Sequence, residues 1–249
     1  MSAGSEAGGA ALPVADRTFG KVLPFTGFDL RMEAGIWTEA EAHRSEIEAE
    51  FAVQLAANPH LWNGRILVLR EFALTGGLLR GHFLETDFAT LLWWRARDWP
   101  ELGAWNAFAL CGLQGNDGAF VLGEMGARTA NSGRVFFPGG TPDLNDVTPD
   151  GRVDLEQSAL RELREETGLD PALIHADGGW SLVFDGARLA LVHRLVFDMP
   201  GEELAARIRD FIAREADPEL SDAVVIRDRT QISDKVTSFA ASYLRHHLP

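Results

Sequence analysis

Cysteine is nearly absent from this sequence, since Cys111 is the single one among 249 residues. One cysteine excludes a disulfide within the chain, and it also excludes a metal centre built from several cysteine ligands. The residue lies in the apolar stretch NAFALCGL. We therefore expect Cys111 to be a small residue of the hydrophobic core.

Positive charge is scarce as well. The chain has 23 Lys and Arg against 37 Asp and Glu, which gives a formal net charge of −14. A protein that binds a nucleic-acid backbone needs a basic face, so this balance argues against a nucleic-acid partner. Such an acidic chain is suited to recruiting divalent cations, although acidic proteins of many other functions are common.

Long hydrophobic runs are missing too. The longest apolar stretches are short and are interrupted by Arg, Asp or Gly, which argues against a transmembrane segment and a membrane partner. The opening MSAGSEAGGAALPVADR lacks the basic start and the long apolar core of a signal peptide. We expect a cytoplasmic protein whose residues 1–19 form a mobile tail.

The next segment, residues 20–100, is predicted to be an N-terminal α/β extension or subdomain. Thr38 followed by Glu41 has the pattern of a capping box at the start of a helix. A later helix is predicted to begin at Thr86 or Asp87 and to stop before Pro100. The expected elements are helices over 38–57 and 86–100, and strands over 65–74 and 77–84 that turn at Gly76-Gly77.

Residues 101–249 mix strands and helices without a regular βαβ alternation, so we predict an α+β fold with a mixed sheet. Two hairpins are expected, with turns at residues 116–118 and at Asp185-Gly186. The expected strands cover 104–113, 118–125, 134–140, 181–199 and 222–227, and the expected helices begin at Asp154 and cover 201–216 and 233–248.

The most informative stretch is RELREETGL, residues 161–169. Its helix is predicted to begin at Asp154, with Gln157 three residues later, and to end at Gly168 in the left-handed conformation. The glutamates at 162, 165 and 166 share one helix face, where like charges cost about 0.2–0.5 kcal/mol per pair. Either they form a solvated acidic face, paired with Arg161 and Arg164, or they hold a divalent cation.

The segment upstream favours the second interpretation. Phe137-Pro138-Gly139-Gly140 predicts a strand that ends in a tight glycine turn. With this entry, the stretch resembles the Nudix hydrolase superfamily. The signature of that family is Gly, five residues, Glu, seven residues, and then Arg-Glu-apolar-x-Glu-Glu-x-Gly-apolar, and residues 161–169 fill its second half completely.

The resemblance covers residues 105–245 and implies an α/β/α sandwich. It also implies a metal-dependent pyrophosphohydrolase, which cleaves a small-molecule diphosphate with Mg²⁺ or Mn²⁺ as cofactor. Glu165 and Glu166 match the direct metal ligands, with Glu162 as the third, and Arg161 matches the residue that orients a motif glutamate. These four residues are the candidate catalytic residues.

Two departures from the signature stand out. Gly140 and Arg161 are 21 positions apart where the signature has 14, so the loop TPDLNDVTPDGR contains seven extra residues. The position eight before Arg161, where the signature has glutamate, is Val153, and from this register we predict a weakened metal site. Asp154 is the expected helix N-cap, whereas Asp143 or Asp146 could reach the site from the longer loop.

Other candidate site residues lie outside the motif. Arg128 and Arg134 flank the loop before the glycine turn, and their planar guanidinium groups suit the recognition of substrate phosphate. A general base is not identified. Glu215 and Glu219 occupy a plausible loop, but each is also readable as a solvated carboxylate.

The substrate classes that the resemblance implies are nucleoside diphosphate sugars, ADP-ribose and dinucleotides. The alternative is a catalytically weak Nudix domain that senses a nucleotide ligand, and Val153 is the one feature that favours it. The extension carries large apolar residues that we expect to pack on the core or across a homodimer interface. These residues are Leu61, Trp62, Leu92, Trp93, Trp94 and Trp99.

Overall fold

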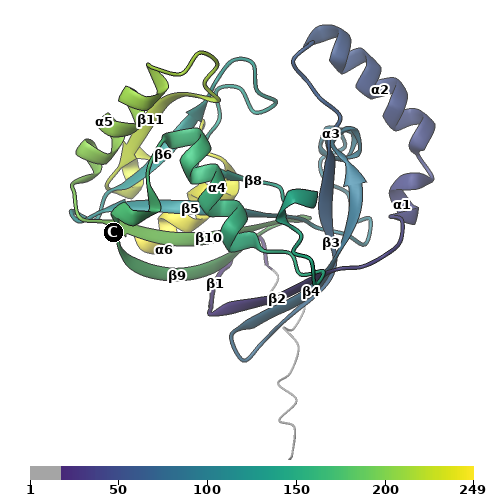
Figure 1. Ribbon diagram of the computed structural model, residues 1–249, viewed down its shortest axis with the longest axis horizontal. Helices are drawn as coiled ribbons and strands as arrows, with labels where there is room; N and C mark the ends of the chain where they lie inside the picture. The colour runs from purple at the N-terminus through teal and green to yellow at the C-terminus, as the bar shows by residue number, and fades with distance from the viewer. Residues whose placement is uncertain (1–17) are drawn as a thin grey trace, which may run out of the picture.

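The computed structural model describes residues 18–249, so the tail predicted for residues 1–19 lies almost wholly outside the described residues. A mixed sheet forms the larger lobe of the molecule (Figure 1). Its strand order is β1 (Val22–Phe25), β9 (Ile174–Asp185), β10 (Arg188–Phe197), β5 (Asn106–Gly115), β6 (Phe120–Met125) and β11 (Leu220–Ile226), with β7 (Val135–Phe136) on β6 and β8 (Gly139–Gly140) on β5.

Helices cover both faces of this sheet. Cys111 of β5 is buried and donates from its thiol to the Ala159 carbonyl of α4 (Leu155–Thr167) at 3.2 Å. Phe108, on the opposite face of β5, packs on Phe239 of α6 (Ser238–His247) with ring centroids 5.0 Å apart. A third helix, α5 (Gly201–Ile212), packs on β11. This arrangement, with β5 and β10 parallel and their other neighbours antiparallel, confirms the predicted α+β class.

A smaller sheet and three helices form the second lobe, on the right in Figure 1. β2 (Gly27–Met32), β4 (Leu78–Asp87) and β3 (Arg65–Thr75) form the sheet, beside α1 (Thr38–Glu41), α2 (Arg44–Ala57) and α3 (Phe88–Ala96). The β3–β4 hairpin turns at Gly76-Gly77 as predicted, and both glycines have positive φ angles, 59° and 80°. The prediction of Asp87 as the cap of α3 is also confirmed, because its side chain accepts from the Thr90 backbone N–H at 2.8 Å.

The helix predicted over 38–57 is instead broken between Glu41 and Arg44, and Thr38 does not form the predicted capping box. Trp37 precedes the first helical residue and is buried, and its indole N–H donates to the Leu102 carbonyl at 2.8 Å. Its ring also packs against Trp94, with centroids 4.8 Å apart. These tertiary contacts of Trp37, which residue spacing cannot show, fix the start of the helical segment.

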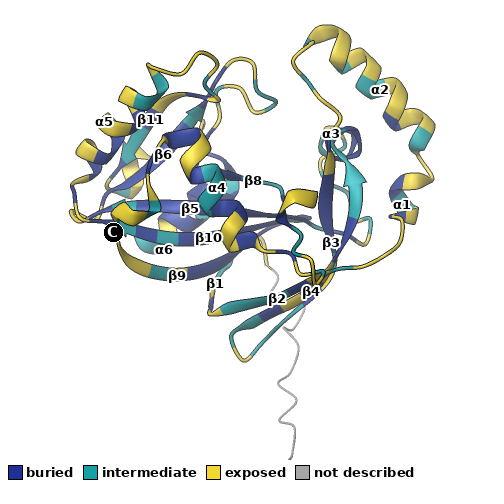
Figure 2. Ribbon diagram, in the orientation of Figure 1, coloured by how far each residue is buried: buried dark blue, intermediate teal, exposed yellow. Residues whose placement is uncertain are grey.

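The two lobes share backbone pairing and a continuous core. β1 lies in the large sheet and β2, two residues later, in the small one, while Leu69 of β3 and Trp105 exchange two backbone hydrogen bonds of 2.9 and 2.8 Å. Figure 2 shows dark blue, buried positions running through both sheets, whereas the outer face of α2 is exposed. The boundary at residue 100 therefore stays a prediction about independent folding units.

Three of the six large apolar residues of the extension are buried inside this chain. Trp93 and Trp94 lie in a core beneath α1 and α2, and Leu92 is buried as well. A two-fold interface is therefore not needed to cover them. Trp62 does not pack on the core of this chain, because 78% of its surface is exposed, and its burial across a homodimer interface stays a prediction. Among residues 18–249, no helix is both long and apolar enough to cross a bilayer.

Candidate active site

Local signals set both ends of α4, as predicted. The Asp154 carboxylate accepts from the Gln157 backbone N–H at 2.9 Å. Gly168 follows the last helical turn with a φ of 66°, the left-handed conformation that glycine adopts without steric cost. A side chain at this position would also collide with the Phe211 ring, so the end of α4 is fixed by packing and by backbone conformation together.

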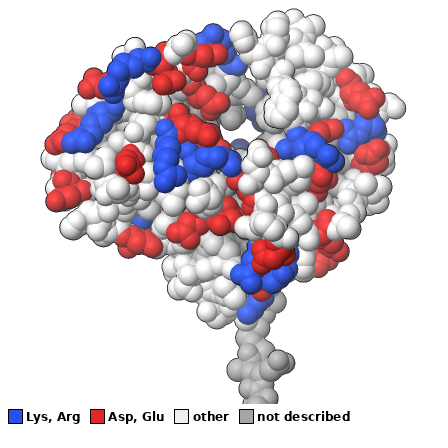
Figure 3. All heavy atoms as spheres, in the orientation of Figure 1, with Lys and Arg blue, Asp and Glu red and all other residues white. Residues whose placement is uncertain are grey.

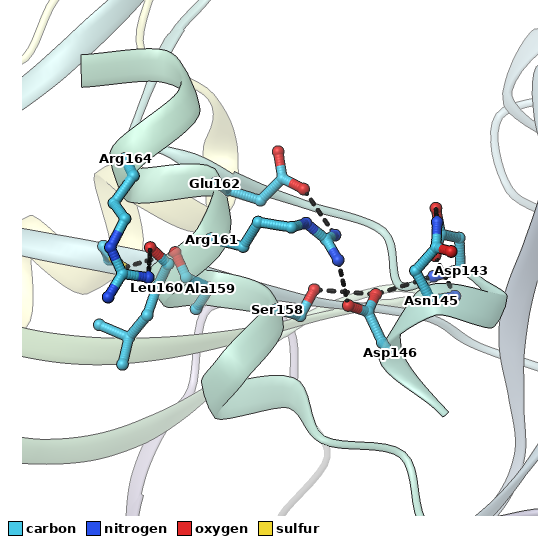
Figure 4. A network of polar contacts seen from close by, with 10 residues as sticks. Asp143, Asn145, Asp146, Ser158, Ala159, Leu160, Arg161, Glu162 and Arg164 are labelled. Atoms are coloured by element: carbon cyan, nitrogen blue, oxygen red, sulfur yellow. Dashed lines mark hydrogen bonds and ion pairs between the residues drawn. The ribbon is translucent and has the colours of Figure 1, made fainter. Parts of the chain in front are cut away.

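The acidic partner of the Arg161 guanidinium group is Asp146. Counting forward from Gly140, five residues precede Asp146, which is the spacing of the first acid in the signature. Its side chain is only 1% exposed and accepts from Arg161 Nη1 at 2.7 Å, from the Ser158 hydroxyl at 3.0 Å and from the Asp143 backbone N–H at 2.9 Å. Arg161 donates from its other terminal nitrogen to Glu162 at 2.9 Å (Figure 4).

The extra residues follow this acid, and the prediction of a weakened site based on Val153 used the wrong register. The segment 147–153 forms a loop whose two ends lie side by side, because the Asp154 N–H donates to the Asp146 carbonyl at 2.8 Å. Val153 is 3% exposed, belongs to the hydrophobic core and donates its N–H to the Leu30 carbonyl of β2 at 2.9 Å. The insertion therefore attaches the extension to the rest of the chain, and Val153 contributes core packing.

Val153→Glu should destabilise the protein by roughly 3–5 kcal/mol, because it places an unpaired carboxylate in the core. Urea denaturation would measure this loss. The exposed neighbour offers a control, since Arg152→Gln should change the free energy of unfolding by no more than about 0.5 kcal/mol. If Val153→Glu kept wild-type stability and reached half-maximal activity at a lower Mg²⁺ concentration, position 153 rather than Asp146 would correspond to the first acid of the signature.

Asp146→Asn should lower the free energy of unfolding by about 1.5–3 kcal/mol, the worth of a hydrogen bond to a charged group. Loss of the contact that positions Arg161, and through it Glu162, should raise the metal concentration needed for half-maximal activity roughly tenfold or more. Denaturation and metal titration would measure the two effects. Asp143→Asn is the matched control, because an amide oxygen can still accept from the Asn145 N–H; an unchanged metal requirement in Asp146→Asn would contradict the assignment.

The glutamates of α4 face unequal surroundings. Glu166 is only 6% exposed, and its Oε2 has no hydrogen-bond partner among the described residues. Burial raises the pKa of Glu166 well above its usual range, and the charges of Glu219 and Glu162 raise it further. Burial also raises the pKa of Glu162, although Arg161 opposes this shift. Glu165 is exposed on the same helix.

Glu219, which precedes β11, completes this acidic group. The residue is exposed overall, but partial burial of its carboxyl group raises the pKa, followed by the charges of Glu165 and Asp217. Sequence reasoning could not separate Glu219 from a solvated loop carboxylate, because its position depends on the packing of β11 against β6. Glu215, the other candidate base, is exposed and is not part of the cleft described below.

The acidic group suits a divalent cation in its donor chemistry. In residues 18–249, no three acidic, His or Cys side chains converge closely enough to form a preassembled metal site. Glu162 turns toward Arg161, which pairs with its carboxylate. The unpartnered oxygen of Glu166, beside two further carboxylates, nevertheless supplies the hard oxygen ligands that Mg²⁺ and Mn²⁺ prefer.

These carboxylates lie in a cleft of about 920 Å³, with residues of both lobes in its walls. Figure 3 shows this face hollowed between the lobes, with acidic side chains on the rim of the hollow. Glu162, Glu166 and Glu219 line the cleft beside Gly139 and Gly140. Six aromatic side chains also line it: Trp62, Phe88, Trp99, Phe108, Phe136 and Phe239.

Both predicted phosphate-binding arginines line the cleft as well. Arg128 forms an ion pair with Asp217, and Arg134 donates to the Asp234 carbonyl at 3.3 Å. Sequence reasoning missed Arg95 and Arg188, which line the same cleft, because neither belongs to a recognisable motif.

Comparisons with known proteins identify the family of this chain. The family model described as the NUDIX domain matches residues 104–235, whereas no curated protein matches the chain. A MutT protein from Methanosarcina mazei Go1 is 16% identical, with a TM-score of 0.36 over 57% of this chain and 92% of its own. The Nudix hydrolase RenU from M. smegmatis is 19% identical, with a TM-score of 0.34 over 56% and 81%. Because the family model covers more than half of the sequence, and because the glycine turn, Arg161 and the glutamate helix lie at its centre, this chain belongs to the Nudix hydrolases.

Proposed function

We propose that this protein hydrolyses a diphosphate bond in a small nucleotide-like molecule, with Mg²⁺ or Mn²⁺ held by Glu162, Glu165 and Glu166. The observation that carries the proposal is the buried, unpartnered carboxylate oxygen of Glu166 beside two further glutamates in a large cleft. A buried carboxylate with a raised pKa is costly to the fold unless a cation compensates it.

The proposed roles follow the contacts of each residue. A bound divalent ion would neutralise charge on the phosphoryl oxygens and lower the pKa of a coordinated water. Asp146 holds Arg161, and Arg161 in turn orients Glu162. Glu219 is the proposed proton acceptor, because a carboxyl group with a raised pKa binds a proton more readily near neutral pH.

The walls of the cleft suit a nucleotide. Flat bases stack on aromatic rings, and guanidinium groups donate paired hydrogen bonds to phosphate oxygens. Arg128 and Arg134 are the proposed contacts for the diphosphate. The proposed substrates are nucleoside diphosphate sugars, ADP-ribose or dinucleotides, in a cytoplasmic enzyme that could work as a homodimer.

A nucleotide sensor is the competing function, and it has lost its one supporting feature. That feature was Val153 at the position of the first motif acid, whereas Asp146 contacts Arg161 and Val153 lies in the core. A domain that only binds a nucleotide also does not require mutually repelling glutamates around the buried, unpartnered oxygen of Glu166.

A phosphate-release screen tests the proposal. The three substrate classes would be incubated with Mg²⁺ or Mn²⁺, and a phosphomonoesterase would convert the products to free phosphate for detection. We expect metal-dependent release from at least one class. If calorimetry detects nucleotide binding but no compound is hydrolysed with either metal, the sensor interpretation replaces the hydrolase.

A further inference from the structure

Arg95 is a half-buried cation on the cleft wall contributed by the extension. It lies near the end of α3, and its guanidinium donates to the Ala130 carbonyl at 3.2 Å and to the Asn131 side-chain oxygen at 3.1 Å. Its partners within residues 18–249 include no carboxylate in an ion pair with it. Burial lowers the pKa of Arg95, and the charge of Arg188 lowers it further.

Arg188 brings a second cation to the same part of the cleft. Its guanidinium carbon is 5.4 Å from the ring centroid of Trp99 and 5.8 Å from that of Phe239. Asp185 pairs with one end of this guanidinium at 2.6 Å, while its buried Nε has no partner among the described residues. Burial lowers the pKa of Arg188, and the nearby Arg134 also lowers it, against the opposing charges of Asp185 and Asp98.

Arg95 is therefore a partly desolvated cation with no carboxylate paired to it among the described residues, and it lies beside Arg188, which Asp185 pairs at one end only. Placing cations in a desolvated cleft without matching anions costs free energy. A bound oxyanion removes that cost, and the planar donors of arginine fit the oxygens of phosphate especially well. The pair Arg95 and Arg188 thus has the composition of an anion subsite.

This pair is separated from the glutamates along β5. Arg188 lies opposite Asn106, whereas Gly139 and Gly140, beside the glutamates, lie opposite Leu110 and Ala109. Three to four residues of strand, at about 3.3 Å each, put roughly 10–13 Å between the two levels. A nucleoside can span such a separation, so one substrate can reach both ends of the cleft.

We infer that Arg95 and Arg188 bind a phosphate monoester on the substrate, remote from the diphosphate that is cleaved. This inference rests on the proposed function for the identity of the cleaved bond. Its preferred substrates are nucleotides that carry an extra phosphate on the sugar. Arg95 is then a specificity-determining residue supplied by the extension, outside the region that the Nudix family model covers.

Matched substrate pairs that differ by one phosphate provide the test. Wild-type kcat/KM should be about tenfold higher for NADPH than for NADH, and for ADP-ribose 2′-phosphate than for ADP-ribose, as expected for one charge-assisted contact. Arg95→Met should remove this preference. Its kcat/KM for NADH and for ADP-ribose, which lack the extra phosphate, should stay within about twofold of the wild-type value. If Arg95→Met instead lowers kcat/KM equally for both members of each pair, or changes nothing, the inference is wrong.

Two control variants separate charge from structure. Asn131→Ala removes the amide contact of Arg95 but keeps the cation, so the preference should persist. Arg207→Met removes an arginine paired with Glu203 on α5, outside the cleft, and should change neither member of a pair. Loss of the preference in Asn131→Ala would mean that loop position, rather than charge, determines it, and would overturn the inference.

A binding measurement keeps the subsite distinguishable from the hydrolysis. In EDTA, calorimetry should show about tenfold tighter binding of adenosine 2′,5′-bisphosphate than of AMP to wild-type protein, and equal binding to Arg95→Met. Intact binding selectivity without any hydrolysis would refute the proposed function and support the subsite. Equal affinity of the wild-type protein for both nucleotides would refute the subsite, whatever the activity.

Discussion

Glu166→Gln should reduce kcat roughly a thousandfold and make the metal-free protein more stable. The substitution keeps the shape of the side chain but removes the charge that a divalent ion requires. A misplaced metal ion would stabilise the transition state less, by several kcal/mol. Each loss of about 1.4 kcal/mol lowers the rate tenfold. Steady-state kinetics at saturating Mg²⁺ would measure the change, and wild-type turnover in this variant would remove Glu166 from the site.

The gain in stability should depend on pH in a defined direction. Glu166 has a raised pKa in the folded protein, against an ordinary value of about 4.3 in the unfolded chain. Below the ordinary value the carboxyl group is protonated in both states, so it makes no difference to folding. As pH rises above that value, the unfolded chain ionises first, so Glu166 increasingly destabilises the folded state until the pH passes the raised pKa.

In EDTA, the advantage of Glu166→Gln over the wild-type protein should therefore grow as the pH rises above about 4, the ordinary pKa of the carboxyl group. Denaturant unfolding at several pH values would measure it. Glu156→Gln makes the same chemical change at an exposed position in the first turn of α4, and its effect should stay within a few tenths of a kcal/mol. A stability difference that is flat with pH would mean that Glu166 is not desolvated as described.

Features that depend on neighbouring residues could be predicted from the sequence. The ends of α4 at Asp154 and Gly168, the Asp87 cap of α3 and the turn at Gly76-Gly77 each depend on a few adjacent residues. The shared helix face of the glutamates follows from their spacing in the same way. The family signature adds the glycine turn, which is likewise local.

Features that depend on distant pairing could not be predicted. β1 and β2 are four and six residues long, and they become strands because β9 and β4 supply partners. The number of residues in a loop does not show where in the loop an insertion lies. The position of the insertion follows from the contact of Asp146 with Arg161 and from the pairing of segment 147–153 with β2. Arg95 becomes a cleft residue only because α3 packs across the cleft from the loop around Asn131.

A fragment that begins at Glu101 should fail to fold into a soluble monomer. The extension supplies Leu30, Leu67, Phe72 and Phe83 to the core that the large sheet also builds. Loss of one buried Phe side chain costs about 3–5 kcal/mol, while a whole domain is stable by only about 5–15 kcal/mol. Removing several such residues together exceeds that margin.

Backbone pairing strengthens this expectation. The fragment would lose β1 from the edge of β9, and it would leave the backbone groups of Trp105 and Val153 without their partners Leu69 and Leu30. Gel filtration and near-ultraviolet circular dichroism of residues 101–249 should show aggregated or loosely packed protein. Supplying residues 1–100 as a separate chain should restore solubility, since the missing contacts are non-covalent. The opposite outcome is that residues 101–249 alone are monomeric, unfold cooperatively and keep the substrate selectivity of the full chain. The extension would then be an independent module, and the cleft wall that it supplies would not contribute to substrate selectivity.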